Sequence, residues 1–307
     1  MDTPLAHFAV SITIAVLPLA LLVLVVGVSA AVVKIDIHAS DMPSGTEDRL
    51  HPHREADVNE DEYESLAEQN SIYLPLVVTP YTEHPAERAA LMALYNHTNG
   101  DGWDDNSGWG TDVSYCTWYG VSCDITGHVK IIDLSWNALT GILPPEIGNL
   151  ANLQVLDLFH NEVSSIPPQI GNLVNLHELH LTSNQLSSLP PEIGNLANLQ
   201  ELHLASNQLS FLPPETGDLA NLQGLILGDN QLSSLTPGIY DLTNLDTLDL
   251  SDNQLSDPIP AALSNLINLY ILDLSGNSDL TCWETQESLD WALTLDYYYG
   301  PTNLCGL

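Results

Sequence analysis

The sequence has very few basic side chains. Its 307 residues include 5 Lys and Arg against 40 Asp and Glu, a formal net charge of −35. The second half is more extreme, because only Lys130 among its residues from 128 onward is a Lys or Arg. A nucleic-acid backbone or an anionic membrane would be repelled, so neither is expected as a partner. Cations, basic proteins and neutral glycans fit this charge, as does an acidity that only keeps the surface soluble.

Catalytic signatures are also missing. The chain contains no G-x-S-x-G elbow, no glycine-rich phosphate loop and no H-E-x-x-H helix motif. Its serines lie mostly in turns between repeated segments rather than beside a general base. We therefore predict no catalytic residue, no cofactor and no resident metal, and we expect that the protein is not an enzyme.

A short repeat fills the second half instead. Seven asparagines recur at steps of 24, 23, 23, 23, 23 and 24 residues, each after two leucine-like positions. A fixed period of this length indicates one small unit stacked on itself. Each Asn stands where the chain leaves a strand, and its carboxamide can pair with backbone groups buried there. We predict a structural ladder of Asn137, Asn161, Asn184, Asn207, Asn230, Asn253 and Asn277.

The two halves of each repeat predict different local structures. The L-x-x-L-x-L half alternates as a strand does, so Leu176, Leu179 and Leu181 should point inward. The returning half contains Pro-Pro-Glu, which is typical of the start of a short helix or 3₁₀ turn. We expect Gly171, Gly194 and Gly217 to end these turns. Stacked units of this kind form an α/β solenoid, with a parallel sheet on the concave face and short turns on the convex face.

These motifs resemble the leucine-rich repeat family over residues 128–280. The first repeat, L-S-W-N-A-L-T-G-I-L-P-P, resembles the plant-type extracellular subclass, and Ile259-Pro260 in the sixth repeat keeps part of that pattern. The middle repeats read S-S-L-P-P, which is closer to bacterial short-repeat proteins. This departure weighs against the second small sheet of the plant subclass.

The cysteines lie at the two ends of the repeats, where an open solenoid needs caps. Cys116 and Cys123 precede the first repeat, and Cys282 and Cys305 follow the last. We predict one disulfide at each end, which implies an oxidising compartment. The segment C-T-W-Y-G-V-S-C resembles the N-terminal cap of extracellular plant-type repeat proteins.

The caps are predicted at residues 81–127 and 281–307. In the first we expect a helix over residues 87–96 and a polar loop anchored by Trp103 and Trp109. In the second we expect a helix near residues 284–296, with Trp283, Leu289, Ala292 and Leu293 sealing the last leucines.

The first eighty residues carry two further signals. Residues 1–34 are largely apolar and long enough for either a membrane anchor or a cleaved signal peptide, and we favour the anchor. Residues 35–80 are mostly acidic and predict a disordered linker, although residues 72–78 also suit a short strand. The protein is therefore expected at the cell surface, in or through the membrane by its N-terminal segment, or secreted.

The outward strand positions form the candidate binding face. Trp136, Phe159 and His160 should form an aromatic patch near its N-terminal end. Glu178 and His180 should stack on Glu201 and His203 of the next strand, so this cluster also suits a divalent metal or a pH-sensitive contact. The candidate ligand-binding residues are Trp136, Asp157, Phe159, His160, Glu178, His180, Glu201, His203, Asp229, Asp249 and Asp252.

Three functional classes follow from this face. The resemblance implies recognition of a protein or glycan through the concave surface, which we take as the leading hypothesis. The second is a cell-envelope spacer or adhesin without a specific ligand. The third and weakest is a metal-dependent hydrolase using the Glu and His patch, because an open solenoid face lacks a water-excluding pocket.

Overall fold

The computed structural model describes residues 32–36, 71–75, 83–256 and 258–306. The chain divides into two units, Met1–Pro80 and Tyr81–Leu307. In the first unit, β1 (Val32–Asp36) pairs antiparallel with β2 (Ser71–Pro75). The short strand that residues 72–78 suggested is therefore present as part of β2. The predicted anchor or signal segment lies outside the described residues apart from its last three positions, and so does most of the acidic linker. Within the described part of the chain, no helix has the length and apolarity needed to cross a membrane.

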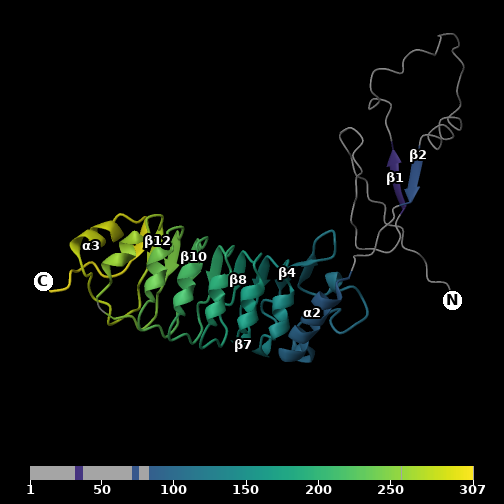
Figure 1. Cartoon of the computed structure of the whole chain (residues 1–307), viewed down its shortest axis with the longest axis horizontal. Coiled ribbons are helices and arrows are strands. Elements are labelled where there is room, and N and C mark those ends of the chain that lie inside the picture. The colour runs from purple at the N-terminus through teal and green to yellow at the C-terminus, as the bar shows by residue number, and fades with distance from the viewer. Residues whose placement is uncertain (1–31, 37–70, 76–82, 257, 307) are drawn as a thin grey trace, which may run out of the picture. The chain divides into compact units, whose positions relative to one another are not determined.

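The second unit is a solenoid built on one nine-stranded sheet (Figure 1). Neighbouring repeat strands pair in parallel with matched register, so that Leu156 faces Leu179 and Leu179 faces Leu202. The matched register follows from the fixed period, because each strand repeats the same inward leucines. The repeat strands are β4 (Val129–Asp133), β6 (Val155–Asp157), β8 (Glu178–His180), β9 (Glu201–His203), β10 (Gly224–Ile226), β11 (Thr247–Asp249) and β12 (Ile271–Asp273).

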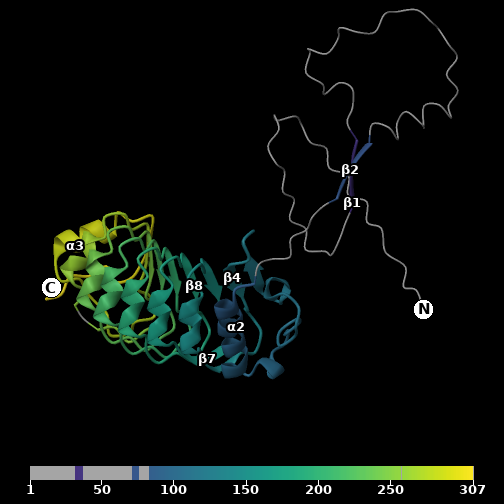
Figure 2. The ribbon, with the colours of Figure 1, turned by 45° about the vertical axis from the view of Figure 1, so that its right-hand side comes forward.

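Short 3₁₀ turns form a second row alongside the sheet, which Figure 2 shows from a rotated view. Proline begins most of them, as predicted, since its fixed φ suits the first helical position. Hydrophobic side chains from both rows close the core, and Ile170, Leu173 and Leu176 are fully buried. The turns are η4 (Pro145–Asn149), η5 (Pro168–Asn172), η6 (Pro191–Asn195), η7 (Pro214–Asp218), η8 (Pro237–Asp241) and η9 (Ala261–Asn265).

The predicted role of the turn glycines was wrong. Gly171, Gly194 and Gly217 lie inside η5, η6 and η7 rather than after them. A Cβ on Gly171 would lie 2.5 Å from the carbonyl oxygen of Glu192 in the next turn. These glycines therefore allow adjacent turns to approach closely, and they do not end the turns.

A second, two-stranded sheet joins the first two repeats only, among the described residues. In it β5 (Thr140–Ile142) runs parallel to β7 (Glu162–Ser165). The expectation against such a sheet holds for the S-S-L-P-P repeats that follow, but it was wrong for the start of the array. The plant-like T-G-I of the first repeat is the segment that forms β5.

The asparagines form a continuous ladder of side-chain to backbone hydrogen bonds. The Nδ2 of Asn207 donates to the carbonyls of Leu181 at 2.9 Å and Leu204 at 3.0 Å, while its Oδ1 accepts from the Leu186 amide at 2.9 Å. Asn137 instead bonds to both backbone groups of Asp105, which joins the first repeat to the cap. From Asn161 onward, each carboxamide thus satisfies buried groups of its own repeat and of the preceding one.

A second asparagine column was not anticipated from the sequence. Its side chains donate to the carbonyl one repeat earlier, as Asn221 does to Ala197 at 2.7 Å. These asparagines are exposed, so each bond replaces one with water and contributes less than a bond of the buried ladder. The column consists of Asn175, Asn198, Asn221, Asn244 and Asn268.

The N-terminal cap seals the first repeat with a helix, an aromatic cluster and a strand. Helix α2 (Pro85–His97) covers the predicted span, and β3 (Val121–Cys123) pairs antiparallel with β4. The Cys116–Cys123 disulfide is present. Trp103 and Trp109 are buried, as predicted, and their ring centroids lie 4.9 Å apart. Two further turns, η2 (Gly100–Gly102) and η3 (Tyr115–Thr117), complete the cap.

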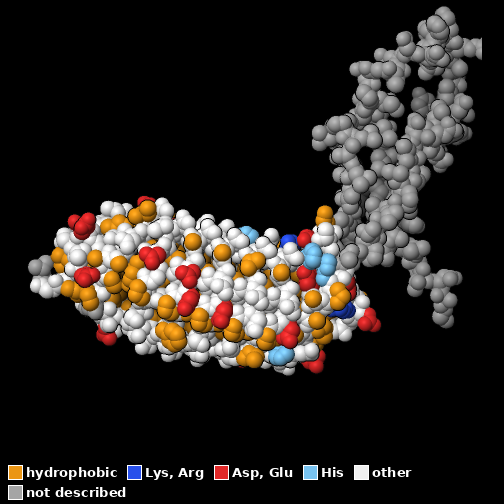
Figure 3. All heavy atoms as spheres, viewed as in Figure 1, with side chains coloured by type: hydrophobic (Ala, Val, Ile, Leu, Met, Phe, Trp, Pro, Cys, Tyr) orange, Lys and Arg blue, Asp and Glu red, His pale blue; other side chains and the backbone are white. Residues whose placement is uncertain are grey.

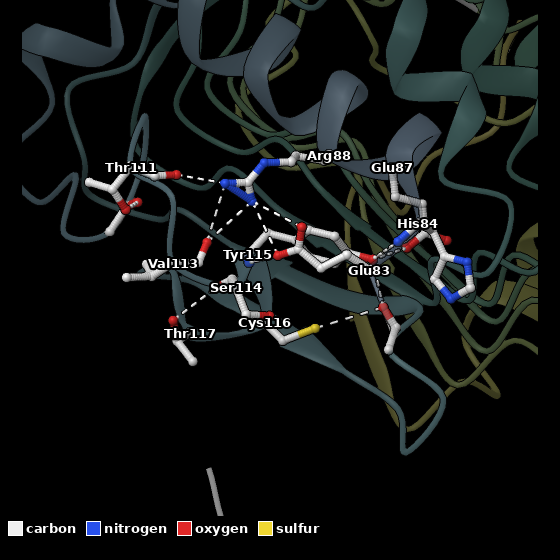
Figure 4. A network of polar contacts seen from close by, with 12 residues as sticks. Glu83, His84, Glu87, Arg88, Thr111, Val113, Ser114, Tyr115, Cys116 and Thr117 are labelled. Carbon is white, nitrogen blue, oxygen red and sulfur yellow. Dashed lines mark hydrogen bonds and ion pairs between the residues drawn. The ribbon is translucent and has the colours of Figure 1, made fainter. Parts of the chain in front are cut away.

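Polar contacts tie the cap together, as Figure 4 shows. Arg88 on α2 donates to the carbonyls of Thr111 and Val113, and its guanidinium lies 5.1 Å from the ring centroid of Trp118. Tyr115 donates to the carbonyl of Gly127 at 2.8 Å. Burial raises the pKa of Tyr115 to about 12, so this phenol stays protonated and keeps its donor role.

The C-terminal cap combines a helix with an additional strand. Helix α3 (Gln286–Ala292) confirms the predicted helix but is shorter, and the Cys282–Cys305 disulfide is present. Trp283, Leu289 and Ala292 are buried as expected. Leu293 is 55% exposed, so its predicted sealing role was wrong. After α3 the chain returns to the sheet as β13 (Tyr297–Tyr299), which pairs with β12.

Candidate functional site

The concave face consists of the side chains that alternate with the buried leucines along the sheet. The register places equivalent positions of successive repeats side by side, so Asp157 faces His180 and His180 faces His203. Glu178 likewise faces Glu201. The columns predicted from the repeat period are therefore the columns that the structure contains.

The three predicted aromatic side chains lie together at the N-terminal end. Trp136 is 59% exposed, and its ring centroid lies 3.3 Å from that of His160 and 5.5 Å from that of Phe159. The Trp136 and Phe159 rings meet edge to face, an arrangement that aromatic quadrupoles favour. The patch is a half-exposed aromatic surface that neighbouring rings hold in place.

The backbone of this patch is left-handed at two bulky residues. The φ angles of Trp136 and His160 are 52° and 53°. The same column has Ser183, Ser206, Asp229 and Asp252 at positive φ, and Gly276 ends it. A side chain other than glycine in this region costs on the order of 1–3 kcal/mol. The turn demands this conformation in every repeat, while the choice of a tryptophan and a histidine for it does not help folding.

Two stacked histidines and their acidic neighbours lie beside the patch. The rings of His180 and His203 are nearly parallel, with centroids 4.4 Å apart. His180 lies between two acids, with Nδ1 3.5 Å from an Asp157 oxygen and Nε2 3.8 Å from a Glu178 oxygen. The Nε2 of His203 lies 3.1 Å from a Glu201 oxygen. The predicted cluster of Asp157, Glu178, His180, Glu201 and His203 is thus assembled across β6, β8 and β9.

Contacts within the cluster change the pKa values of two of its members, His180 and Asp157. The hydrogen bond that the His180 ring donates to the Asp157 carboxylate raises the pKa of His180, against a smaller lowering by burial. Burial acts to raise the pKa of Asp157, but the hydrogen bonds from His180 and from the Phe159 amide together lower it. The imidazolium and the carboxylate therefore stabilise one another across the strands.

The remaining predicted acids lie apart from this cluster. Asp229 and Asp252 occupy the left-handed column beyond β10 and β11, and Asp249 is on β11. The carboxylate of Asp249 accepts hydrogen bonds from the Ser251 amide at 2.9 Å and from its hydroxyl at 2.6 Å, which fixes its orientation. Gly224 and Gly228 lie between the two groups, on the strand and turn of the fifth repeat. The candidate residues therefore form an aromatic and histidine-rich end and a separate acidic end.

Metal binding and catalysis gain no geometric support from the described ranges. No group of three or more His, Cys, Asp and Glu side chains in them is arranged to hold a metal ion. All four cysteines are in disulfides. A pocket of about 130 Å³ in the described part of the chain is lined by residues of the fifth to seventh repeats such as Leu235, Tyr240 and Ile259. It contains none of the predicted site residues.

The sequence reasoning missed the far end of the concave face. Tyr297 and Tyr299 extend two concave columns by one strand, because β13 pairs Tyr297 with Ile271 and Tyr299 with Asp273. Both are about half exposed, and Tyr270 lies against Tyr297 with ring centroids 5.2 Å apart. Three consecutive tyrosines are a strand-favouring signal, but they follow no repeat pattern and were not assigned to the face.

Comparison with known proteins agrees with this geometry. The leucine-rich repeat region family matches residues 126–208 and 168–293, and the leucine-rich repeat N-terminal domain family matches residues 84–124. Leucine-rich repeat protein 2 of Arabidopsis thaliana is 35% identical over 94 residues, which is 29% of this chain and 41% of that protein. Receptor-like protein kinase 5 of the same plant is 40% identical over 62 residues, 20% of this chain and 6% of the kinase.

Among solved structures, a leucine-rich repeat protein of Leptospira interrogans superposes with a TM-score of 0.51 and 40% sequence identity. The match covers 56% of this chain and 42% of that one. The chain thus spans less than half the length of each of these relatives. With the repeats, the cap and both disulfides in place, this chain belongs to the leucine-rich repeat family.

Proposed function

We propose that the solenoid is an extracellular recognition module that binds a protein or glycan through the N-terminal end of its concave face. The contact surface is the aromatic patch of Trp136, Phe159 and His160. One observation carries the proposal: a tryptophan that is 59% exposed lies at a φ of 52°, in a turn column where the third to seventh repeats have Ser, Asp or Gly.

The energetics support binding rather than folding as the purpose of this patch. The left-handed turn accepts serine or aspartate in four other repeats and glycine in the seventh. Exposed Trp and His side chains there gain little from burial in the free protein. Covered by a partner, the same rings would bury a large apolar surface, and tryptophan is among the residues that most often dominate binding energy. The neighbouring rings restrict the motion of Trp136, which lowers the entropy lost on binding.

The location outside the cell is supported by the two disulfides. They join Cys116 to Cys123 and Cys282 to Cys305, one at each end of the array. Such bonds persist in oxidising compartments. A receptor-like kinase is among the relatives, which supports recognition by the repeats. The match covers only 6% of that protein, so its kinase activity is not carried over to this chain.

The test is a pull-down from a cell-envelope extract with the full-length chain as bait. The test variant changes Trp136 and Phe159 to Ala. The matched control is Phe211→Ala, because Phe211 is exposed to a similar degree but lies outside the concave columns. We expect a partner that the wild type and the control retain and that the double variant loses.

Equal retention by all three proteins would overturn the proposal. Weak, salt-sensitive binding by all three would favour the envelope-spacer alternative, in which the acidic surface only solvates the protein. Circular dichroism of each variant checks that the fold is unchanged.

A further inference from the structure

The C-terminal end of the concave face carries a cluster of tyrosines that no repeat requires. Tyr297 and Tyr299 are 47% and 51% exposed, and both lie on the side of β13 that continues the concave columns. Tyr298, between them, points the other way and is partly buried. The two exposed rings therefore extend the face beyond the last repeat strand.

A rigid support holds this strand in place. Tyr298 accepts a hydrogen bond from Nε1 of the fully buried Trp283 at 3.0 Å and donates to the carbonyl of Pro301 at 2.5 Å. The backbone of β13 accepts a bond from the Leu274 amide at 2.6 Å. Tyr270 packs edge to face on Tyr297. The exposed rings are consequently presented with little freedom, as a preorganised contact surface would be.

Carboxylates flank the rings. In the register of the sheet, Tyr299 lies beside Asp273, and Asp273 lies beside Asp249. Each of these aspartates accepts hydrogen bonds from a serine two residues on, so both are held in place. Asp296 is exposed and adjoins Tyr297 in the chain.

Among residues 83–256 and 258–306, no Lys or Arg side chain lies near these carboxylates to neutralise their charge. The sequence contains no Lys or Arg after Lys130, which lies on β4 at the opposite end of the sheet and pairs with Asp124 at 3.5 Å. Figure 3 shows acidic side chains spread along the visible face of the solenoid. On that face, Lys and Arg side chains lie only at the end with the N-terminal cap. A second copy of this chain would bring the same acidic surface and be repelled.

We propose that Tyr270, Tyr297 and Tyr299, with Asp249 and Asp273, form a second binding site on the concave face that receives arginine side chains of a basic protein segment. A guanidinium can stack on a tyrosine ring while its N–H groups bond to a carboxylate, and the position of Tyr299 beside Asp273 suits both contacts. This second site rests on the proposed recognition function. It specifies which partner chemistry would bind at the C-terminal end of the same concave face.

The experiment measures fluorescence anisotropy of labelled peptides titrated with the full-length protein at low salt. The probe is a ten-residue peptide that alternates arginine and glycine. A matched peptide replaces each arginine by citrulline, which keeps the planar group and loses the charge. A third peptide has glutamate instead.

Three protein variants separate the contributions. Tyr297→Leu with Tyr299→Leu removes the rings and keeps apolar strand residues, whereas Tyr297→Phe with Tyr299→Phe keeps the rings. The third variant changes Trp136 and Phe159 to Ala. We expect the arginine peptide to bind wild type and the Phe variant within about twofold of each other, and the Leu variant at least about fivefold more weakly. The citrulline peptide should lose at least about fivefold on the wild type, and the glutamate peptide should not bind.

Equal affinity of the Leu variant and the wild type for the arginine peptide would overturn the site, and so would equal binding of citrulline and arginine. These outcomes are distinct from a failure of the proposed function. The pull-down tests the Trp136 patch: a partner lost by its Trp136 and Phe159 variant leaves the function standing, and equal peptide affinities of the wild type and the Leu variant then refute this site alone. A melting curve of the Leu variant that matches the wild type confirms that the strand still docks.

Discussion

Glu87 and His128 form a hydrogen-bonded pair that joins the cap helix to the start of the first repeat strand. The Nδ1 of His128 lies 2.8 Å from Oε1 of Glu87, and Glu87 is only 4% exposed. The other Glu87 oxygen accepts from the Val129 amide at 3.0 Å, and the Tyr115 hydroxyl oxygen lies 3.3 Å from it. One carboxylate on the cap helix therefore holds the start of the first repeat strand.

Glu87→Ala should detach this cap. It leaves the buried Val129 amide without its acceptor and removes the partner of the partly exposed His128 ring, and we expect a loss of about 3 kcal/mol of unfolding free energy. Chemical denaturation measures the loss, and amide exchange should rise first in α2. Glu83→Ala is the control, since that acid pairs with Arg88 near the surface and its removal should cost under about 1 kcal/mol. Equal effects of the two substitutions would contradict the assigned role.

Asn207→Ala should be strongly destabilising, by about 2–4 kcal/mol. It leaves the Leu186 amide unpaired in the interior, which costs about 1–3 kcal/mol. The Leu181 and Leu204 carbonyls each lose one of two donors, since Asn184 and Asn230 still bond to them, and each lost bond costs about 0.5–1.5 kcal/mol. Asn221→Ala removes one exposed bond of the second column and should cost no more than about 1 kcal/mol. A melting temperature that falls equally for both would show that the buried ladder has no special role.

Ser206→Gly should stabilise the protein by about 0.5–1 kcal/mol. Ser206 has a φ of 51°, which glycine adopts without strain. Ala205→Gly, one position earlier and outside the left-handed set, should instead cost about the same amount because glycine loses more chain entropy. Urea denaturation of both variants measures whether the free energy of unfolding rises or falls. A lower free energy of unfolding in both variants would refute backbone strain in this column.

His180→Gln should weaken the protein most at mildly acidic pH. The pKa of His180 is raised by Asp157, so the stability from its charged form is fully present below the ordinary pKa of about 6.5 and is lost as the pH rises through the raised value. Both side chains are still about one quarter exposed and the N–O distance is 3.5 Å, so the difference should stay below about 1 kcal/mol. It should also fade near pH 4 and below as Asp157 becomes protonated through its lowered pKa.

Melting temperatures of wild type and His180→Gln between pH 4.5 and 9 test this dependence. His177→Gln is the matched control in the same repeat, outside the strand pair of His180 and His203. A difference between wild type and His180→Gln that grows toward high pH would refute the assigned ion pair.

Much of the concave face was predictable because the repeat period, which can be read directly from the sequence, assigns equivalent positions to neighbouring strands. Once Leu179 and Leu202 are assigned to equivalent inward positions, the register of their strands follows, and His180 must lie beside His203. The aromatic patch follows in the same way from Trp136 and Phe159. Which acid each histidine contacts was not predictable, since side-chain rotamers and not the register place His180 nearer to Asp157 and His203 nearer to Glu201.

The sequence by itself determined the solenoid, its asparagine ladder and the positions of its caps, because each of these depends on a period or on neighbours along the chain. The tertiary structure alone decided that Gly171 serves close packing of turns, and that the first two repeats share β5 and β7. It also decided that Tyr297 and Tyr299 join the face. Their strand forms by hydrogen bonding to the open edge of β12, and such an edge exists only after the repeats have stacked.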